Sequence, residues 1–499
     1  MDNAQNPTAQ AELESIQNFS GKYPKQLWYL FLSEMWERFC FYGMRGMLAV
    51  FMVERLLLDD RTANLQYGAI QAFVYAFTFV GGLFADKILG FRKSLFWGGA
   101  MMILGSFIIA AAPEKLFYFG ICFTIIGTGF FKPNISTMVG ALYKDGDSRR
   151  DAGFGLFYSG INMGALLGGV TMVLIGKMYS WSLAFAMAGI VMTISLAIFV
   201  FTQRTLGPIG LSPLKETMSD SKKKMLEYGT YLGSLLCIPF ILILVTNSAY
   251  TDMFMYIIGP ATLIYLFIEM QKYSAAEKRK LIAALIFIIF SVFFWAFFEQ
   301  SGGSLSLFAL NNLHPNLLGF SIDPNVVNNS SNSIFVILFS PLLGLLWVAM
   351  SKKKVEPNAG MKFGLGFLFL ALAFFVFYYT INFADAEGKT SLNIFTLAYL
   401  IITLGELCLS PIGLSLMTQL APQKMQGLMM GMWFLASAYG QYVAGLLGAD
   451  MSVTGENATA MEKLISYTNG YKQLALYALV AGVLLIALSP VIKKMMSSK

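Results

Sequence analysis

The feature that most limits the fold of this chain is a series of apolar stretches that match the length of membrane-crossing helices. A transmembrane helix needs about 20 predominantly apolar residues to cross about 30 Å of hydrocarbon. The chain has 499 residues, of which 57% are hydrophobic and only 13% are charged. A soluble domain of this length does not need so many apolar stretches, so the sequence predicts an all-α membrane protein.

The apolar stretches predict fourteen transmembrane helices, in an order of six, two and six. The first six lie near residues 28–54, 67–89, 94–112, 116–138, 152–176 and 181–203. After a polar segment, two further spans are expected near 229–248 and 252–271. The last six lie near residues 279–310, 327–350, 362–384, 392–420, 425–449 and 472–492.

This order of spans predicts five segments. They are an N-terminal cytoplasmic tail at 1–27, a first six-helix bundle at 28–203, a cytoplasmic linker with an inserted helix hairpin at 204–275, a second six-helix bundle at 276–493 and a C-terminal cytoplasmic tail at 494–499. The first segment lacks the positive region followed by an apolar core that marks a cleaved signal peptide. We therefore expect it to be a short polar tail.

Basic residues indicate which loops face the cytoplasm, because lysine and arginine beside short loops are retained on that side. They cluster in GFRK, KDGDSRR, two SKKK segments, EKRK and the terminal KKMMSSK. All of these lie inside if the N-terminus is inside, so we expect both termini in the cytoplasm. This topology also accounts for the net charge of +7, and a nucleic-acid-binding patch is an unnecessary second explanation.

An internal repeat relates the fifth and the eleventh of the long spans. The segments GLFYSGINMGALLGG and GMWFLASAYGQYVAG carry glycines at the same separations: Gly155, Gly164 and Gly169 in the first, and Gly431, Gly440 and Gly445 in the second. The constant offset suggests two halves of parallel ancestry, an arrangement in which one bundle rocks against the other. Alternatively, these small residues only permit close helix packing.

Ionisable residues inside the apolar spans are the strongest functional signal. In the segment SEMWERFCFYG, Glu34, Glu37 and Arg38 share one helical face, and Arg45 lies on the same stripe. An ionised side chain that faces lipid costs several kcal/mol. This face must therefore meet a partner or a water-filled cavity.

Three more ionisable residues lie within other spans, namely Lys132, Glu299 and Glu406. Together with the charges of the first span, the apolar spans then contain three basic side chains and four carboxylates. Structural ion pairs explain one or two of these residues, but three bases do not neutralise four acids. At least one carboxylate should bind a proton or an incoming cation. Fixed basic groups and a surplus acid can bind a zwitterionic ligand together with a proton. This favours a proton-coupled solute transporter.

Two other classes of membrane protein fit the sequence less well. An embedded enzyme needs a nucleophile with a base, or a metal site, but the only histidine is His314 in a loop and the four cysteines are scattered through apolar spans. We expect no catalytic residue, no metal site and no disulfide framework. A channel needs a continuous polar pore, whereas these charges cluster on a few helices.

Six motifs, in order along the chain, resemble those of the proton-coupled oligopeptide transporter (POT) family, a branch of the major facilitator superfamily. They are ExxERFxxYG in the first span, GGLFADKILGFRKS after the second, GFFKPNIS in the fourth, FYSGINMGALLG in the fifth, FEQ in the seventh and GELCLSPIG in the tenth. The resemblance covers nearly the whole chain, and the two inserted helices are similar to those of bacterial members.

This resemblance implies a major facilitator fold of two six-helix bundles plus two inserted helices. It also implies a carrier without a cofactor, in which protons drive the import of di- and tripeptides, and of peptide-like drugs, across a bacterial inner membrane. We expect the monomer in the lipid bilayer to be the functional unit. The nearest alternative is a related carrier of nitrate, a drug or another small anion.

The resemblance also implies which residues hold the substrate. Its C-terminal carboxylate would be held by Arg38 and Lys132, together with Tyr42, Tyr75 and Tyr158. Its N-terminal ammonium would be held by Glu406, with Asn162, Asn332 and Ser410. Trp295 and Trp433 would line pockets for the side chains of the peptide, although ordinary helix packing explains each of these aromatic residues as well.

A second set of roles concerns coupling and gating. The residues are Glu34, Glu37, Arg38, Arg45, Lys132 and Glu299. Protonation of the two acids beside Arg38 would respond to whether that cation is occupied by substrate. Arg45 is the implied gate partner of Glu299, and Asp86 resembles part of a cytoplasmic latch. A charge cluster that only sets the topology is the alternative for Asp86.

The chain departs from the family pattern at three places. Phe41 replaces one of two usual tyrosines, so one hydroxyl is missing beside the predicted site. Ser333 follows Asn332 where proline is common, which weakens the match at Asn332. The membrane histidine of animal relatives is also missing, so coupling is expected to depend on carboxylates.

Overall fold

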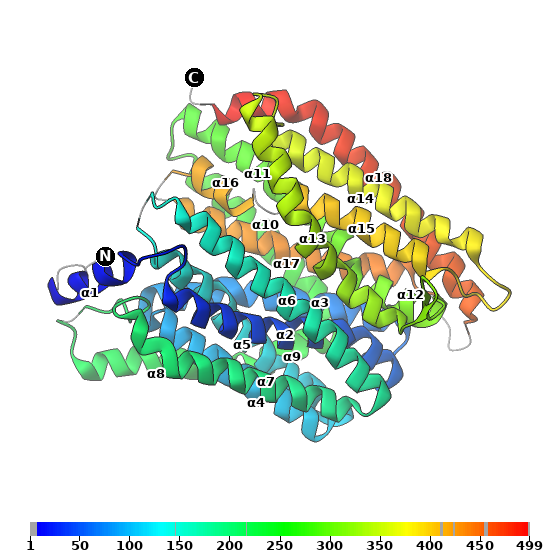
Figure 1. The fold of residues 1–499 in the computed structure, drawn as a ribbon, viewed down its shortest axis with the longest axis horizontal. Helices are drawn as coiled ribbons and strands as arrows, with labels where there is room; N and C mark the ends of the chain where they lie inside the picture. Colours follow the sequence, from blue (N-terminus) through cyan, green and yellow to red (C-terminus); the bar gives the residue numbers. More distant parts are fainter. Residues whose placement is uncertain are drawn as a thin grey trace. The chain divides into compact units, whose positions relative to one another are not determined.

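The computed structural model describes residues 7–144, 146–215, 217–409, 413–422, 425–453 and 458–497. These residues are almost entirely helical, with one short β-hairpin (Figure 1). Twelve helical segments among them are long and apolar enough to cross a membrane. The predicted fold class, an all-α membrane protein, is confirmed.

Two further helices correspond to predicted spans but are not among these twelve. They are α2 (Lys25–Glu54), which carries the charges of SEMWERFCFYG, and α17 (Gln426–Met451). They are 30 and 26 residues long, respectively. The expected number of fourteen spans therefore stays a prediction.

Backbone packing divides the chain into two compact units. Unit 1 contains Met1–Met47 and Phe73–Thr246, whereas unit 2 contains Leu48–Ala72 and Asn247–Lys499. The segment Leu48–Ala72 thus packs with C-terminal elements, although the sequence places it in the first predicted bundle. The predicted domain boundaries stay a prediction, and each unit is described by itself below.

Unit 1 is built from helices of the N-terminal half. It contains α1 (Pro7–Gln17), most of α2, the end of α3 (Asp60–Phe84), η2 (Ala85–Leu89), α4 (Phe91–Ala111), α5 (Pro113–Ala141), α6 (Arg149–Met178), α7 (Trp181–Thr202), η3 (Gln203–Leu206), α8 (Asp220–Leu236) and α9 (Ile238–Thr246). Helix α4 packs against both α5 and α7 (Figure 1). Glycine has no Cβ atom. If one were added to Gly98 or to Gly127, it would clash with the carbonyl oxygen of the other residue. These glycines therefore allow α4 and α5 to approach with their backbones in contact.

The N-terminal segment contains a helix, α1, that the sequence analysis did not predict. At its C-terminal end, Gln17 Nε2 donates hydrogen bonds to the carbonyl oxygens of Ala141 and Tyr143, at 3.0 and 3.3 Å. The guanidinium carbon of Arg149 lies 3.9 Å from the ring centroid of Phe19. A short polar helix has no hydropathy signal, and these contacts hold the segment against the ends of α5 and α6.

Unit 2 is built mostly from helices of the C-terminal half. It contains the end of α2, the start of α3, α10 (Ser248–Met270), α11 (Ala275–Phe298), η4 (Glu299–Gly302), α12 (Ser304–Asn312), β1 (Asn316–Leu317), β2 (Phe320–Ser321), α13 (Pro324–Lys352), α14 (Ala359–Tyr379), η5 (Thr380–Phe383), α15 (Leu392–Leu409), α16 (Gly413–Leu420), α17 and α18 (Ala460–Met496). Helix α14 packs against α15 and α18, and α11 packs against α17. Strands β1 and β2 pair in antiparallel orientation.

One predicted span differs in detail from the helices. The span expected near 229–248 begins earlier, at Asp220, and is divided into α8 and α9. Hydropathy detects only the apolar part of a helix, so a polar end and a local break are missed here. The span expected near 392–420 contains α15, to Leu409, and α16, from Gly413, and the three residues between these helices lie outside the described residues.

The internal repeat has a structural counterpart inside each unit. In unit 1, a Cβ on Gly164 of α6 would meet the carbonyl oxygen of Met35 and the Cβ of Arg38 on α2. In unit 2, a Cβ on Gly440 of α17 would meet the Cβ of Trp295, and also the carbonyl oxygen of the residue one turn before it on α11. Both a repeat and simple close helix packing account for this approach, so the repeat stays a prediction.

Candidate functional site

The charged face of α2 is a buried cluster in which two acids share one base. Arg38 Nε donates a hydrogen bond of 2.7 Å to Glu34 Oε1 and lies 2.8 Å from Glu37 Oε2. The side chains of Arg38 and Glu37 are 2% and 0% exposed. Spacings of three and four residues put these groups on one helical face. The prediction that they lie together is confirmed.

The cluster also contains polar atoms that no described residue satisfies. Arg38 Nη1 and Nη2 are buried without a hydrogen-bond partner among the described residues, as are Glu34 Oε2 and Glu37 Oε1. A buried guanidinium with both terminal nitrogens unpaired is costly, because those donors have lost water and gained nothing in return. Two parallel N–H donors of this kind match the two oxygens of a carboxylate.

A second cation, Lys132 on α5, lies beside aromatic rings of the same unit. Its Nζ is 4.3 Å from the ring centroid of Tyr75 and 5.4 Å from that of Phe41. The guanidinium carbon of Arg38 is 5.6 Å from the same Phe41 ring. The structure therefore brings Arg38, Lys132 and Tyr75 into one neighbourhood, as the family resemblance implies. Phe41, noted there only for its missing hydroxyl, provides a ring near both cations.

Arg45 and Tyr42 pair one turn apart on α2, since the Arg45 guanidinium carbon lies 5.7 Å from the Tyr42 ring centroid. Glu299 begins η4 in unit 2 and is 3% exposed. Because Arg45 and Glu299 belong to different units, their pairing as a gate stays a prediction.

Tyr158 and Asn162 lie one turn apart on α6, where Asn162 Nδ2 donates a hydrogen bond of 3.0 Å to the carbonyl oxygen of Tyr158. Asn162 is buried, whereas the Tyr158 side chain is partly exposed. Asn162 and Glu406 lie in different units, so the predicted cooperation of these two residues is also still a prediction.

Glu406 on α15 is the centre of a polar group in unit 2. Asn332 Nδ2 of α13 donates hydrogen bonds of 2.7 Å to Glu406 Oε2 and 3.2 Å to Thr403 Oγ1. The structure thus brings Asn332 and Glu406 together, with serine rather than proline after Asn332. Sequence reasoning missed Thr403, although its position three residues before Glu406 places it on the same helical face. Ser410 lies outside the described residues.

Both predicted pocket tryptophans take part in helix packing. Trp295 on α11 lies edge-on to Phe294 and Phe298, with ring centroids 5.4 and 5.5 Å away. A Cβ on Gly413 of α16 would meet the indole ring of Trp433, which is 8% exposed. These contacts favour the packing alternative for both residues, and their role beside substrate stays a prediction.

The predicted cytoplasmic latch residue lies in an unusual turn. Asp86 is exposed within η2, a π-helical segment between α3 and α4. Gly90, with φ at +74°, separates η2 from α4, a backbone conformation that favours glycine. Arg92 donates a hydrogen bond of 2.7 Å to the carbonyl oxygen of Ile209 and another to that of Gly207. The basic part of the motif therefore holds the segment after η3, and a latch role for Asp86 stays a prediction.

Among the described residues, no group of three or more histidine, cysteine, aspartate or glutamate side chains is placed to hold a metal ion. All four cysteines are free thiols.

Comparison with known proteins identifies the relatives of this chain. The sequence model of the POT family matches residues 92–464. The chain is 35% identical to the peptide transporter YePEPT of Yersinia enterocolitica, over 85% of this chain and 88% of that protein. It is 30% identical to dipeptide and tripeptide permease B of Aeromonas hydrophila, over 95% and 94% of the two chains.

The fold has a counterpart among solved structures. A crystal structure of the peptide transporter POT in complex with sulfate matches 98% of this chain and 99% of that one, with a TM-score of 0.83 and 31% sequence identity. The molecule is therefore a membrane transporter of the major facilitator type and not an enzyme. Within that class, the chain belongs to the POT family.

Proposed function

We propose that this protein imports di- and tripeptides, together with protons, across a bacterial inner membrane by alternating access. The observation that carries the proposal is Arg38, whose Nε is paired with acids while Nη1 and Nη2 are buried and unpaired among the described residues. The C-terminal carboxylate of a peptide would satisfy both nitrogens at once. Lys132 lies near the same Phe41 ring and would add a second positive charge.

The other end of the peptide is assigned to Glu406. Its Oε2 already accepts a hydrogen bond from Asn332, so the carboxylate is held in a defined orientation for a substrate ammonium. Recognition of a carboxylate and an ammonium selects the ends of a short peptide and the distance between them. The side chains of the peptide are then free to vary, and peptide-like drugs with the same two end groups would also be accepted.

Coupling to protons is assigned to Glu34 and Glu37. One guanidinium cannot neutralise two carboxylates, so the cluster on α2 carries an excess negative charge unless one acid binds a proton. A substrate carboxylate at Arg38 adds a third negative charge beside them, which favours protonation. Proton and peptide would then bind together, without any other cofactor. Arg45 and Glu299 remain the proposed gate, and Asp86 the proposed latch.

Counterflow in vesicles tests this function directly. Purified protein is reconstituted in lipid vesicles loaded with unlabelled Ala-Ala, and entry of labelled Ala-Ala is measured with and without an imposed proton gradient. Competition by nitrate, by N-acetylated Ala-Ala and by Ala-Ala amide distinguishes the substrate classes. We expect only peptides with both free ends to compete strongly. Competition by nitrate alone would instead indicate a carrier of small anions.

The proposed topology places both termini in the cytoplasm and requires the loop before α6 to face the cytoplasm as well. In intact cells, Arg150→Cys should be protected from a membrane-impermeant thiol reagent, whereas Asp323→Cys should react. The opposite labelling pattern would show that the chain crosses the membrane in the reverse orientation. Size measurements in lipid discs would test whether the monomer is the functional unit.

A further inference from the structure

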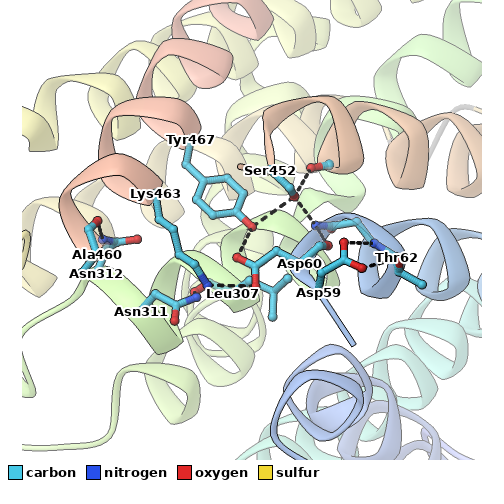
Figure 2. A network of polar contacts seen from close by, with 12 residues as sticks. Asp59, Asp60, Thr62, Leu307, Asn311, Asn312, Ser452, Ala460, Lys463 and Tyr467 are labelled. Atoms are coloured by element: carbon cyan, nitrogen blue, oxygen red, sulfur yellow. Dashed lines mark hydrogen bonds and ion pairs between the residues drawn. The ribbon is translucent and has the colours of Figure 1, made fainter. Parts of the chain in front are cut away.

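A closed ring of polar contacts joins the start of α3 to the end of α17 and the start of α18, all within unit 2 (Figure 2). Asp60 Oδ1 lies 3.1 Å from Lys463 Nζ, and Asp60 Oδ2 accepts a hydrogen bond of 3.1 Å from the Tyr467 hydroxyl. That hydroxyl lies 3.3 Å from Ser452 Oγ, which accepts a hydrogen bond of 3.1 Å from Asn64 Nδ2. Asn64 Nδ2 also donates to the carbonyl oxygen of Asp60, at 2.9 Å, which completes the ring.

Next to the ring, the backbones of α3 and α17 are in contact. A Cβ on Gly68 would lie 2.7 Å from Gly445 Cα, and a Cβ on Gly445 would lie 2.8 Å from the carbonyl oxygen of Asn64. A Cβ on Gly448 would likewise meet the amide of Asn64. We call this contact between residues 60–71 of α3 and residues 441–452 the α3 seam.

The α3 seam buries polar atoms among its apolar side chains. Asn64, Gln71 and Gln441 are 1%, 2% and 2% exposed. Asn64 Oδ1, Gln71 Oε1 and Gln441 Oε1 have no hydrogen-bond partner among the described residues. Each of these acceptors would gain a hydrogen bond from water if the helices separated. Small residues let the two helices close tightly, and the unsatisfied acceptors gain hydrogen bonds when the helices separate.

The ion pair of Asp60 and Lys463 is also in a position where it can separate. Asp60 is the first residue of α3, and Lys463 lies in the first turn of α18. Groups at helix ends can be hydrated as soon as the helices part, whereas a charge left alone in a closed seam is strongly unfavourable. The ion pair therefore stabilises the closed seam, and the separated helices allow both charges to be hydrated. A closed seam in which the two charges are unpaired is unfavourable.

The segment that carries Asp60 has to leave α17 and α18 if the two predicted bundles rock. Leu48–Ala72 packs with unit 2, although the sequence assigns it to the first bundle at 28–203. We propose that Asp60, Lys463 and Tyr467 form a latch that closes the outer side of the transporter along the α3 seam and is released when that side opens. This inference rests on the proposed function and topology, and it adds a gate distinct from Arg45 and Glu299.

Spin labels at the exposed edge of the seam test the latch. Arg61 and Asp450 form an ion pair of 3.6 Å with side chains 45% and 75% exposed, so both positions accept a label without entering the ring. Arg61→Cys and Asp450→Cys are combined in full-length protein whose four native cysteines are replaced by alanine, and the distance between labels is measured in lipid discs without peptide. We expect Asp60→Asn to raise the population at the longer distance about tenfold or more relative to the parent.

Two matched controls make the result specific. Glu356→Gln removes an ion pair with Lys362 in the same unit and should leave the distances unchanged. Gly445→Ala keeps every polar group but adds a methyl into the seam and should act like Asp60→Asn, whereas Gly344→Ala, with nothing within 4 Å of its Cβ, should not. A single short distance that is identical in all variants would overturn the latch and leave the seam as static packing.

Cross-linking tests whether release is needed for transport. A reducible thiol cross-linker between the cysteines at positions 61 and 450 should stop both gradient-driven uptake and counterflow, and reduction should restore them. Undiminished transport by the cross-linked protein would reject the latch. The distance measurement needs no substrate, so a shift without any peptide transport would support the latch and contradict only the proposed function. Normal peptide uptake with fixed distances would contradict only the latch.

Discussion

Asn332 donates a hydrogen bond of 2.7 Å to the carboxylate of Glu406, from a helix 74 residues away in the sequence. A carboxylate that an amide holds in one orientation is suited to receive a mobile cation. In the proposed function this cation is the terminal ammonium of a peptide. The Asn332–Glu406 pair is therefore the first target for substitution.

Glu406→Gln should weaken binding of Ala-Ala by about 10- to 100-fold, because a hydrogen bond to a charged group is worth about 1.5–3 kcal/mol. The amide keeps the size of the side chain, so thermal stability should change little. Binding of N-acetylated Ala-Ala, which lacks the ammonium, should be nearly the same in both proteins. Calorimetric titration with both ligands checks the assignment. If the mutant still prefers the free amine to the same degree as the parent, Glu406 does not bind it.

Glu37→Gln and Arg38→Ala should have different effects, although the two side chains form one ion pair. Glu37→Gln should abolish uptake driven by a proton gradient but keep exchange of peptide for peptide, because exchange needs no net proton movement. Arg38→Ala should lose both activities and also stability, since breaking a buried pair from one side costs about 3–5 kcal/mol. Uptake, exchange and melting temperature are compared at matched expression. Full gradient-driven accumulation by the Glu37→Gln protein would remove this residue from coupling.

Phe41→Leu should weaken the arrangement of Arg38 and Lys132, because both cations lie within 6 Å of the Phe41 ring. A cation–π contact is worth about 0.5–2 kcal/mol, so peptide affinity should fall by about 2- to 30-fold. Phe41→Tyr keeps the aromatic face and serves as the matched control, with affinity close to that of the parent. Equal affinities for the leucine and tyrosine variants would show that the ring does not position these cations.

Asp385 should contribute to stability at neutral pH but not in strong acid. Its Oδ1 accepts hydrogen bonds of 2.9 Å from the backbone amides of Lys389 and Glu387, and these lower the pKa of the carboxyl below its usual value near 3.8. Since the folded pKa is depressed, the stabilisation is present above the unfolded pKa and is lost as the pH falls through the folded pKa. His314 Nε2 lies 2.9 Å from Asp385 Oδ2.

Melting temperatures of the parent and of Asp385→Asn, measured from neutral pH down to about pH 3, check this prediction. The difference between the two proteins should be constant near neutrality and should shrink in acid. A difference that grows as the pH falls would mean that the carboxylate is not the stabilising form.

Much of the site was predictable from the sequence because the relevant rules are local. A helix repeats every 3.6 residues, so the positions of Glu34, Glu37 and Arg38 alone predict a shared face. The same rule could have identified Thr403 beside Glu406. The same periodicity puts Phe41 on the stripe of Arg38, but the contact of its ring with Lys132 was missed because Lys132 belongs to another helix, α5.

The sequence by itself determined that the chain is a helical membrane protein, where most of its helices lie, and that charges are buried within them. These properties follow from hydropathy and helical periodicity over about 20 residues at a time. Only the tertiary structure decided that Asp60 meets Lys463 and Tyr467, and that Leu48–Ala72 packs with the C-terminal helices. Contacts between residues some 400 positions apart depend on the packing of whole helices, and no local pattern in one sequence records which helices will meet.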